Sequence, residues 1–542
     1  MRTNLLEYMK KVSGWLFRMM LLVQLVGCMP DLDLINPQEI SVDTYYQTPE
    51  QLEAAIIPAY QALIGRTQGG YARNLYYQLL APGDDFTNTF KWEPMYQATY
   101  NTPASDGMAA SSWRDLWNGV FAANIAIDRI SNYEGEIEEE RRNRMLGEAH
   151  FLRGLHYMHL SMLFGETIPF ITLPVSSDED YYPGHSEPGQ IYGLIIDDFK
   201  QAAELLPLRS ALYANEAHIG RATKGSAQGY LARAYLYRPI LEKGQPADFA
   251  SAQTELKKVI DSQEYDLMSS YSDNFKESTE NNRESLFEVQ LHNGPGWLGE
   301  DMASSWRWQE IGMFDGTGGA WWNLAPVQKV YDEFETGDPR KYMTLWCDNG
   351  AYYTDLNGNV SDYDDWMANL ATDKDLYGTR KYCPDTQVAD IDNGINQRLL
   401  RYADVLLMYA ECLNENGDTD GAKAYIDLVR NRANNIVPSE QSHLWYKSSR
   451  GTIPDVDGLL AADVTINGVR LNTVKNIIAH ERFVELCGEY LRYFDLLRWG
   501  MADPTWLAPL QELGWTERAM YYPFPQAELD NNRNLVGNDM NR

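Results

Sequence analysis

The segment Thr473–Gly500 holds the residues of this sequence whose types and spacing come nearest to those of a metal centre. His480 and Glu481 have the order found on a zinc-protease helix, where a glutamate acts as general base beside the ion. Such a helix needs a second histidine four residues after the first, because both imidazoles must reach one metal from the same helix face. Position 484 is Val484. The segment is therefore predicted to be structural, with no metal and no catalytic residue.

Other groups that could do chemistry give weaker signals. His156 and His159 share one predicted helix, but no carboxylate stands beside them at a fixed ligand spacing. The run Asp355–Asn359 begins like a calcium-binding loop, but Val360 stands where that loop needs glycine and Trp366 where it needs glutamate. We predict no cofactor, and a structural calcium ion elsewhere in the acidic loops stays open.

Apart from its chemistry, Thr473–Gly500 has the apolar period of a single long helix. One helix face carries the apolar side chains at intervals of seven, three, four and three residues, namely Ile477, Val484, Cys487, Leu491 and Phe494. Opposite charges recur three residues apart in the pairs Arg482/Glu485, Glu489/Arg492 and Asp495/Arg498. Such pairs suit a helix surface or a polar interface, and we expect these side chains to bond across neighbouring helices.

The rest of the chain predicts a mainly α fold. Amphipathic helices are expected at residues 48–63, 113–130, 143–164, 191–206, 223–241, 249–261, 399–414 and 419–433. The last four form two helix–turn–helix pairs, each about 34 residues long, that resemble tetratricopeptide units. Between them, Tyr265–Asp392 is rich in Gly, Asn, Asp and aromatic residues, with short β-like runs such as Ser285–Leu291. The predicted fold is a tetratricopeptide-like helical-pair scaffold with a large loop-rich, aromatic insertion containing short β-strands.

Composition and the N-terminus indicate an exported protein. The formal net charge of −31 and the pI of about 4.6 exclude a nucleic-acid partner, which needs a basic face. Met1–Arg18 is basic, Met19–Val26 is a short apolar run, and Gly27 precedes Cys28, which is the order of a secretory signal. A cysteine directly after Leu-x-Gly also resembles the lipobox of bacterial lipoproteins, so we predict lipidation of Cys28.

We expect the chain to have five parts. They are a lipoprotein signal peptide at 1–27, the lipidated cysteine and a tether at 28–47, an N-terminal helical part at 48–264, a loop-rich ligand-binding insertion at 265–395, and a C-terminal helical part at 396–542. Loops held by a rigid scaffold usually carry the binding residues, which is why the insertion is expected to bind the ligand.

Four stretches of the chain carry a family signature. They read EAHFLRGLHYMHLSMLFGETIPFIT from Glu148, LRYADVLLMYAECLNENGDTDGAKAYIDLVRNRA from Leu400, HERFVELCGEYLRYFDLLRWG from His480 and MYYPFPQAELDNNRN from Met520. Together with the Cys28 lipobox, they resemble the SusD/RagB family of Bacteroidota outer-membrane lipoproteins over nearly the whole mature chain. Cys487 and Tyr490 stand where the family often has other residues, and these departures concern the scaffold alone.

The resemblance implies a function. Members of this family are anchored in the outer membrane by their lipid, face the outside of the cell, and capture glycans or other nutrient oligomers. They pass these ligands to a TonB-dependent transporter of the SusC type and do no covalent chemistry, so this chain is not expected to be an enzyme. The family's ligand site is a shallow aromatic arc made of loops, and the signature helices transfer no ligand residue to this chain.

Two stretches offer the aromatic faces and hydrogen-bonding side chains that a sugar needs, residues 84–100 and 297–323. From them we predict six ligand-binding aromatic residues, Trp92, Tyr96, Trp306, Trp308, Trp321 and Trp322. Packing of these side chains against the helices is the competing interpretation. Two other functions stay open: a tetratricopeptide-type scaffold that binds only protein, and a surface glycoside hydrolase whose carboxylate pair has no sequence signature.

Overall fold

The structure is a computed structural model that describes residues 45–65, 70–88, 100–291, 323–347, 351–354, 360–362, 377–382, 394–435, 444–446 and 452–537. The chain divides into two compact units, Met1–Gln51 and Leu52–Arg542. In the first unit, Thr48 and Gln51 cap the start of α3 (Pro49–Ile64) reciprocally, with N···O distances of 3.0 and 3.3 Å. This is the helix start that the order Thr-Pro-Glu-Gln predicts. Among these described residues, no helix is long and apolar enough to cross a membrane.

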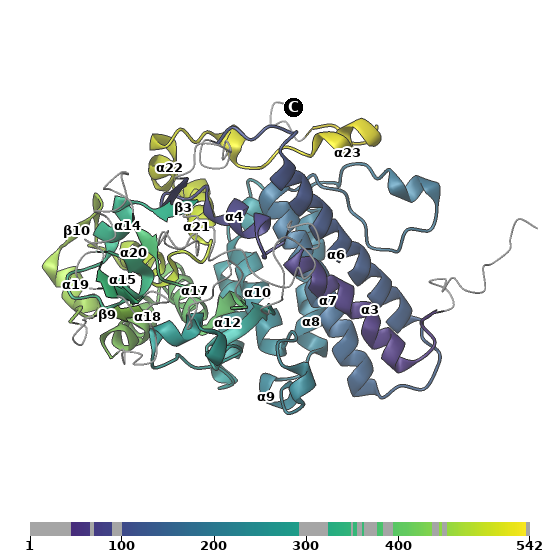
Figure 1. The fold of residues 1–542 in the computed structure, drawn as a ribbon, viewed down its shortest axis with the longest axis horizontal. Coiled ribbons are helices and arrows are strands. Elements are labelled where there is room, and N and C mark those ends of the chain that lie inside the picture. Colours follow the sequence, from purple (N-terminus) through teal and green to yellow (C-terminus); the bar gives the residue numbers. More distant parts are fainter. Residues whose placement is uncertain are drawn as a thin grey trace, which may run out of the picture. The chain divides into compact units, whose positions relative to one another are not determined.

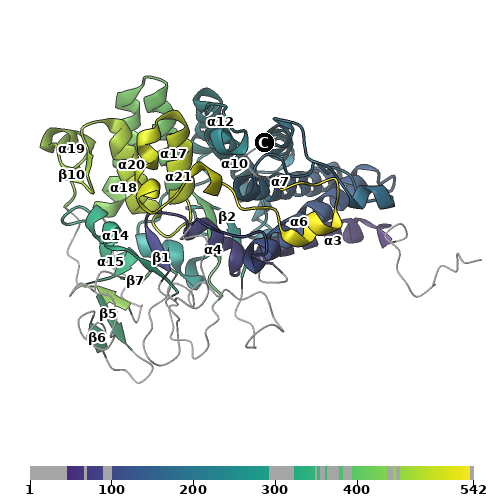
Figure 2. The same cartoon turned by 90° about the horizontal axis from the view of Figure 1, so that it is seen from above.

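The second unit is built on a run of helices in which each packs against the next along the chain (Figure 1). The run consists of α6 (Gly107–Ser131), α7 (Glu139–Phe164), α8 (Gln190–Leu205), α10 (Lys224–Leu236), α12 (Phe249–Asp261), α17 (Tyr402–Glu415) and α18 (Thr419–Asn434). Figure 2 shows these helices along one side of the unit and the small strands β1, β5, β6 and β7 along the other. The predicted mainly α fold of paired helices is confirmed.

Two helices begin earlier than the apolar period predicts. α6 begins at Gly107 and α7 at Glu139, a few residues ahead of the predicted starts. Asp106 caps α6 by accepting a hydrogen bond from the Ala109 N–H at 2.7 Å. The acidic first turn of α7 is favourable beside the positive end of the helix dipole. α6 begins mostly with small residues and α7 with charged ones, and neither start carries large apolar side chains at helical spacing, so periodicity alone places both starts too late.

Two predicted helices differ from the observed elements. Residues 399–401 belong to strand β8 (Gln397–Arg401), and α17 starts only after it. Residues 223–241 divide into α10 and a short α11 (Arg238–Leu241), which begins beside Pro239. A proline lacks the N–H that a continuing helix would use, which accounts for the break.

The single long helix predicted over Thr473–Gly500 is also wrong. The chain forms α20 (Val474–Leu486) and α21 (Arg492–Ala502), with a turn between them. Gly488 and Tyr490 have φ angles of +74° and +55°, which is the left-handed region and is incompatible with a right-handed helix. The apolar stripe is nevertheless buried on both sides of the turn.

Short antiparallel strands join distant parts of the second unit. The pairs are β1 (Phe86–Asn88) with β3 (Leu324–Pro326), β2 (Ser285–Val289) with β8, β4 (Leu345–Trp346) with β7 (Gly378–Thr379), β5 (Ala351–Thr354) with both β6 (Val360–Asp362) and β9 (Leu444–Tyr446), and β10 (Thr465–Ile466) with β11 (Val469–Arg470). The remaining short helices include α4 (Asn74–Leu80), α9 (Arg209–Leu212), α14 (Gln328–Glu333), α15 (Arg340–Thr344), α19 (Val456–Ala462), α22 (Ala508–Glu512) and α23 (Gln526–Asn531). The predicted β-run at 285–291 is confirmed as β2.

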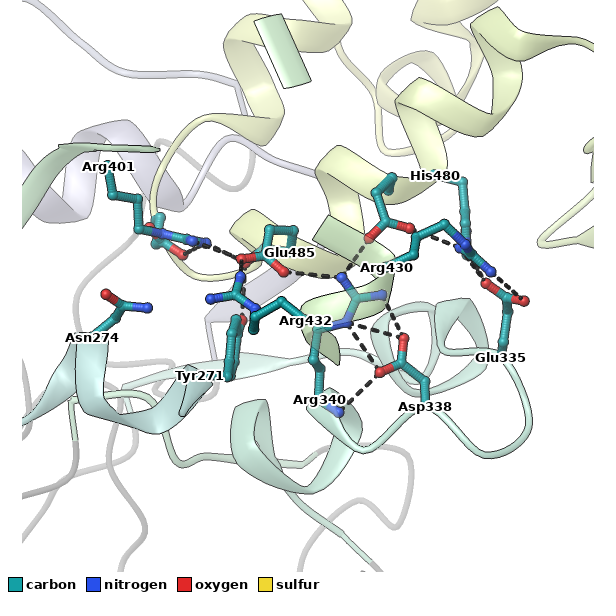
Figure 3. A network of polar contacts seen from close by, with 12 residues as sticks. Tyr271, Asn274, Glu335, Asp338, Arg340, Arg401, Arg430, Arg432, His480 and Glu485 are labelled. Carbon is teal, nitrogen blue, oxygen red and sulfur yellow. Dashed lines mark hydrogen bonds and ion pairs between the residues drawn. The ribbon is translucent and has the colours of Figure 1, made fainter. Parts of the chain in front are cut away.

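The acidic face of α20 packs into a buried cluster of arginines (Figure 3). Glu485 accepts from Arg401 at 2.6 Å and from Arg340 at 2.9 Å, and Arg432 also bonds it. Glu481 accepts from Arg430 at 2.8 Å. The arginines come from β8, α15 and α18, so this helix ties three separate stretches of chain together. Burial alone would raise the pKa of Glu485, but the arginines outweigh it and hold that pKa well below its usual range.

The predicted bonding across neighbouring helices is confirmed by Arg482. Its guanidinium donates to Asp404 of α17 at 2.6 Å and to Asp495 of α21 at 2.8 Å, and not to Glu485 three residues away. Asp495 and Arg498 do form their local pair, at 2.8 Å. All of these groups are buried, so the charged side chains of this segment form buried ion pairs that hold neighbouring helices together.

His480 forms two ion pairs, and a change of pH tests them. Its imidazole lies 2.9 Å from Glu333 and 3.2 Å from Glu335. Burial lowers the pKa of His480, but the two carboxylates outweigh it and raise that pKa to about 9. The ionised imidazole therefore contributes stability that is complete below the ordinary pKa of about 6.5 and is lost as the pH rises through 9.

We expect wild type to lose on the order of 3 kcal/mol of unfolding free energy between about pH 6.5 and 9 relative to His480→Gln, at about 1.36 kcal/mol per pKa unit. Urea denaturation at several pH values measures this difference. His218→Gln is the matched control, and a pH-independent difference between wild type and His480→Gln would contradict the ion pairs. We also expect metal content to stay at background in both proteins.

Candidate functional site

The predicted ligand-binding aromatic residues Trp92, Tyr96, Trp306, Trp308, Trp321 and Trp322, and the lipidation residue Cys28, lie outside the described residues. The structure describes the residues on both sides of the segments that carry these aromatics. Trp346, another tryptophan of the insertion, is in the described part and is 1% exposed in β4. For that residue, packing is the role that the structure shows.

The two aromatic stretches are joined at their base by the ribbon of β1 and β3. Asn88 pairs with Leu324 in the antiparallel register. Residues 89–99 continue from Asn88, and residues 292–322 end one residue before Asn323, which is buried next to Leu324. Paired strands lie about 4.8 Å apart. One segment therefore departs where the other arrives, although they are far apart in sequence.

A third segment reaches the same ribbon through Tyr377. This residue follows directly on residues 363–376, and its N–H donates to the Pro326 carbonyl at 3.1 Å. Its ring stacks on Tyr331 of α14, with the ring centroids 4.9 Å apart and the planes at 10°. The Lys341 ammonium lies 3.1 Å from the centroid of the Tyr331 ring. The ribbon thus has an aromatic and cationic support at its side.

Asp84 fixes the other end of the ribbon to the scaffold. Its carboxylate accepts from Lys329 of α14 at 2.5 Å and from Arg492 of α21 at 2.7 Å. Burial alone would raise the pKa of Asp84, but Arg492 and then Lys329 outweigh it and hold that pKa well below its usual range. The turn after α20 therefore leads to an arginine that positions β1, which links the signature segment to the candidate site.

Asp85, the next residue, has an unusual environment. It is buried, and its Oδ1 has no hydrogen-bond partner in the part of the chain that the structure describes. Its backbone carbonyl accepts from the Val327 N–H at 3.1 Å, which extends the ribbon. Burial, followed by the negative charge of Asp84, raises the pKa of Asp85 to about 7.

This pKa gives a prediction for Asp85→Asn. The folded-state pKa lies above the ordinary value near 3.8, so ionised Asp85 destabilises the fold increasingly as the pH rises from about 4 to 7. We expect Asp85→Asn to be more stable than wild type above pH 7, by up to about 4 kcal/mol at about 1.36 kcal/mol per pKa unit, and similar to it near pH 4. Denaturant unfolding measures the difference. Exposed Asp530→Asn is the control, and equal stability of Asp85→Asn and wild type at pH 8 would refute the assigned pKa.

A cavity of about 390 Å³ opens beside Tyr100, the first described residue after 89–99. The Tyr100 hydroxyl donates to the Pro82 carbonyl at 2.9 Å, so the Tyr100 side chain reaches the segment that leads into β1. Tyr493 and Tyr522 contribute rings to the cavity wall, and Asn101 stands at its exposed edge. Aromatic faces beside an amide suit a ligand with apolar faces and hydroxyl groups.

His156 and His159 of α7 are packing residues. His156 fills a notch at Gly119, where a Cβ atom would stand 2.2 Å from its Nε2, and this nitrogen lies 2.9 Å from the Ala59 carbonyl oxygen. His159 lies 2.6 Å from the Tyr71 hydroxyl. Burial lowers the pKa of His156 to about 4 and that of His159 to about 3. Within the described ranges, no group of three His, Cys, Asp or Glu side chains is placed to hold a metal ion.

Sequence reasoning missed the ribbon. Each strand has three residues, and such runs as Phe86–Asn88 and Leu324–Pro326 carry no period that separates them from a loop. The prediction had already selected Asp84–Tyr100 and Trp297–Asn323 as separate aromatic stretches. Their shared base is the feature that the structure adds.

Comparison with known proteins identifies the family. A family model described as "SusD family" matches residues 258–540, and a second model, described as "Starch-binding associating with outer membrane", matches residues 32–236. The chain belongs to the SusD family, as its signature stretches predicted. This family is non-catalytic, which agrees with the prediction that the chain is not an enzyme.

Relatives and solved structures extend this match over most of the chain. SusD-like protein P2 of Formosa agariphila is 27% identical, covering 96% of this chain and 97% of that protein. A SusD homolog from Bacteroides thetaiotaomicron has a TM-score of 0.71 at 23% identity, covering 92% of this chain and 98% of that one. Surface glycan-binding protein A from Bacteroides thetaiotaomicron, in complex with laminarihexaose, has a TM-score of 0.67 at 20% identity, covering 90% and 99%. The fold is therefore that of SusD-like proteins.

Proposed function

We propose that this protein is a lipid-anchored lipoprotein of the outer-membrane surface that binds glycans, or other nutrient oligomers, and delivers them to a TonB-dependent transporter of the SusC type. The ligand is held by the aromatic residues predicted above, in one segment before the insertion 265–395 and one segment within it. The observation that carries this proposal is the pairing of Asn88 with Leu324, because it gives two tryptophan-containing segments a common base.

Known proteins of the same fold support the ligand class. One structure of this fold is described with a xylogluco-oligosaccharide and another with laminarihexaose. The second family model is described as starch-binding and as associating with the outer membrane. Sugars present flat C–H faces that stack on tryptophan and tyrosine, and hydroxyl groups that need amide and carboxylate partners. The aromatic segments at the ribbon have this composition.

Isothermal titration of the purified full chain tests the proposal. The panel contains maltoheptaose, laminarihexaose, a xyloglucan oligosaccharide and a mixed set of peptides, and we expect saturable heat with at least one oligosaccharide. Copurification from native outer membranes is expected to bring down a large β-barrel transporter. Absence of heat with every ligand, together with absence of a transporter, would reject the function.

Cys28→Ser tests the anchor. Stable residence in a membrane requires more than one acyl chain, since each buried CH₂ contributes only about 0.8 kcal/mol. We expect the variant to incorporate no radiolabelled palmitate and to leave the outer-membrane fraction, while Met29→Ala behaves as wild type. Unchanged labelling and fractionation of Cys28→Ser would show that Cys28 is not the residue that anchors the protein in the membrane.

A further inference from the structure

A second cavity, of about 250 Å³, lies between α6, the connection after α7, and the C-terminal segment around α23. Figure 1 shows α6 and α23 next to each other, and an edge of the cavity is formed by Glu528 of α23. None of its lining residues lines the cavity at Tyr100. Both cavities border α23, since Leu529 lines the one at Tyr100 and Glu528 lines this one.

The lining of this second cavity has apolar faces with polar groups at the edge. Trp117 and Phe121 present neighbouring rings from α6, with centroids 5.9 Å apart. Tyr181 lines the cavity from the connection after α7 and is 67% exposed. Asn118 and Asp180 add hydrogen-bonding groups. Flat rings with amide and carboxylate groups beside them match a ligand that alternates C–H faces and hydroxyls.

Trp117 is packed into the wall of this cavity. The residue is 6% exposed, and its Nε1–H has no hydrogen-bond partner among the residues that the structure describes. Its ring is held by Tyr157 and Trp113, with both centroids 5.7 Å away. A buried indole N–H ordinarily finds an acceptor. The Nε1 atom itself is fully buried, so a ligand in the cavity would contact the exposed part of the indole ring and not this donor.

We propose that this cavity is a second saccharide-binding site, which takes a neutral sugar residue. Its charged lining is Asp180, Glu528 and Arg114, and the whole chain carries a net charge of −31. Uronate or sulfated sugars would meet that negative field, whereas an uncharged ring would not. This site goes beyond the proposed function, because its argument rests on α6 and the C-terminal segment and uses no residue of the ribbon.

Tryptophan-selective ¹⁵N labelling of the full chain tests the proposal directly. Trp117→Phe keeps a packed ring, removes the indole N–H, and so assigns the Trp117 resonance. Maltotriose, laminaritriose and xylotriose are titrated in turn to millimolar concentration, with a galacturonic acid trisaccharide as the charged comparison. We expect the Trp117 resonance to shift saturably with at least one neutral trisaccharide and not with the charged one.

Two tyrosines provide a matched pair of variants. Tyr181 lines the cavity, whereas its neighbour Tyr182, 50% exposed, does not. We expect Tyr181→Ala to weaken the Trp117 titration at least tenfold, or about 1.4 kcal/mol, and Tyr182→Ala to leave it unchanged. The Trp117 titration should also persist in a Trp92→Ala/Trp322→Ala protein, which lacks the aromatic residues of the proposed loop site. Loss of binding at the loops can therefore be distinguished from loss of binding at this cavity. No Trp117 shift with any neutral trisaccharide, equal effects of the two tyrosine variants, or a shift with the charged sugar would each overturn the proposal.

Discussion

Replacing Arg401 with alanine is expected to lower the free energy of unfolding by about 3–5 kcal/mol, the range seen when one partner of a buried ion pair is removed. Arg401 is 1% exposed and donates to Glu284, Glu485 and Glu489 at 2.7, 2.6 and 2.7 Å. Without it, three buried carboxylates lose part of their counter-charge. Guanidinium denaturation, followed by circular dichroism, measures the change.

The matched control for Arg401→Ala is Arg470→Ala. Arg470 also forms an arginine–carboxylate pair, with Asp463, but its side chain is 60% exposed. An exposed pair of this kind contributes roughly 0–1 kcal/mol, so we expect little change. Arg401→Lys keeps the charge and loses the forked geometry, and we expect intermediate stability. Similar effects of Arg401→Ala and Arg470→Ala on the free energy of unfolding would show that the buried ion pairs around α20 do not stabilise the fold more than an exposed pair does.

The second large effect is expected at the aromatic segments. Trp92→Ala combined with Trp322→Ala should weaken glycan binding at least a hundredfold, or about 2.8 kcal/mol at about 1.4 kcal/mol per tenfold. Central aromatic residues of binding sites often contribute about 2 kcal/mol or more each. The two positions lie in different segments, and only a shared site at the ribbon makes both contribute to one ligand. Titration calorimetry with the best glycan of the panel gives the affinity.

Trp506→Ala serves as the control for this pair, since Trp506 is a partly exposed tryptophan that packs on Trp499 of α21. Its affinity for the glycan should equal that of wild type. The unfolding free energy of the double variant should also change little, because residues that bind ligand from loops add little to the core. Undiminished affinity with a large loss of stability would establish the packing interpretation for Trp92 and Trp322 in place of the binding one.

The helices could be predicted from the sequence because their information is local. The apolar period gave α12 its observed bounds, and the order Thr-Pro-Glu-Gln gave the start of α3. Both signals lie within the helix or one turn outside it. The turn between α20 and α21 was missed because the apolar stripe continues through it. The left-handed conformation of Tyr490 has no sequence signature of its own, since tyrosine is not a residue type that favours it.

Contacts between distant residues could not be predicted in the same way. Glu485 reads as the local partner of Arg482, and its actual partners Arg340, Arg401 and Arg432 come from other elements. The ribbon of β1 and β3 depends likewise on which of many short runs pair. Sequence composition selected the aromatic segments of the candidate site, and tertiary pairing decides that two of them share a base.

The buried arginine cluster also limits how the chain can be shortened or recombined. Arg340 and Lys381 reach Glu485 and Glu489 from inside the insertion 265–395, at 2.9 and 3.0 Å. A chimera that excised the whole insertion would therefore leave acidic groups of the C-terminal part without counter-ions. Exchange between relatives is best made within residues 89–99 and 292–322, beyond Asn88 and before Asn323. Under the proposed function, grafting there is expected to alter ligand preference while leaving the buried ion pairs of the scaffold intact.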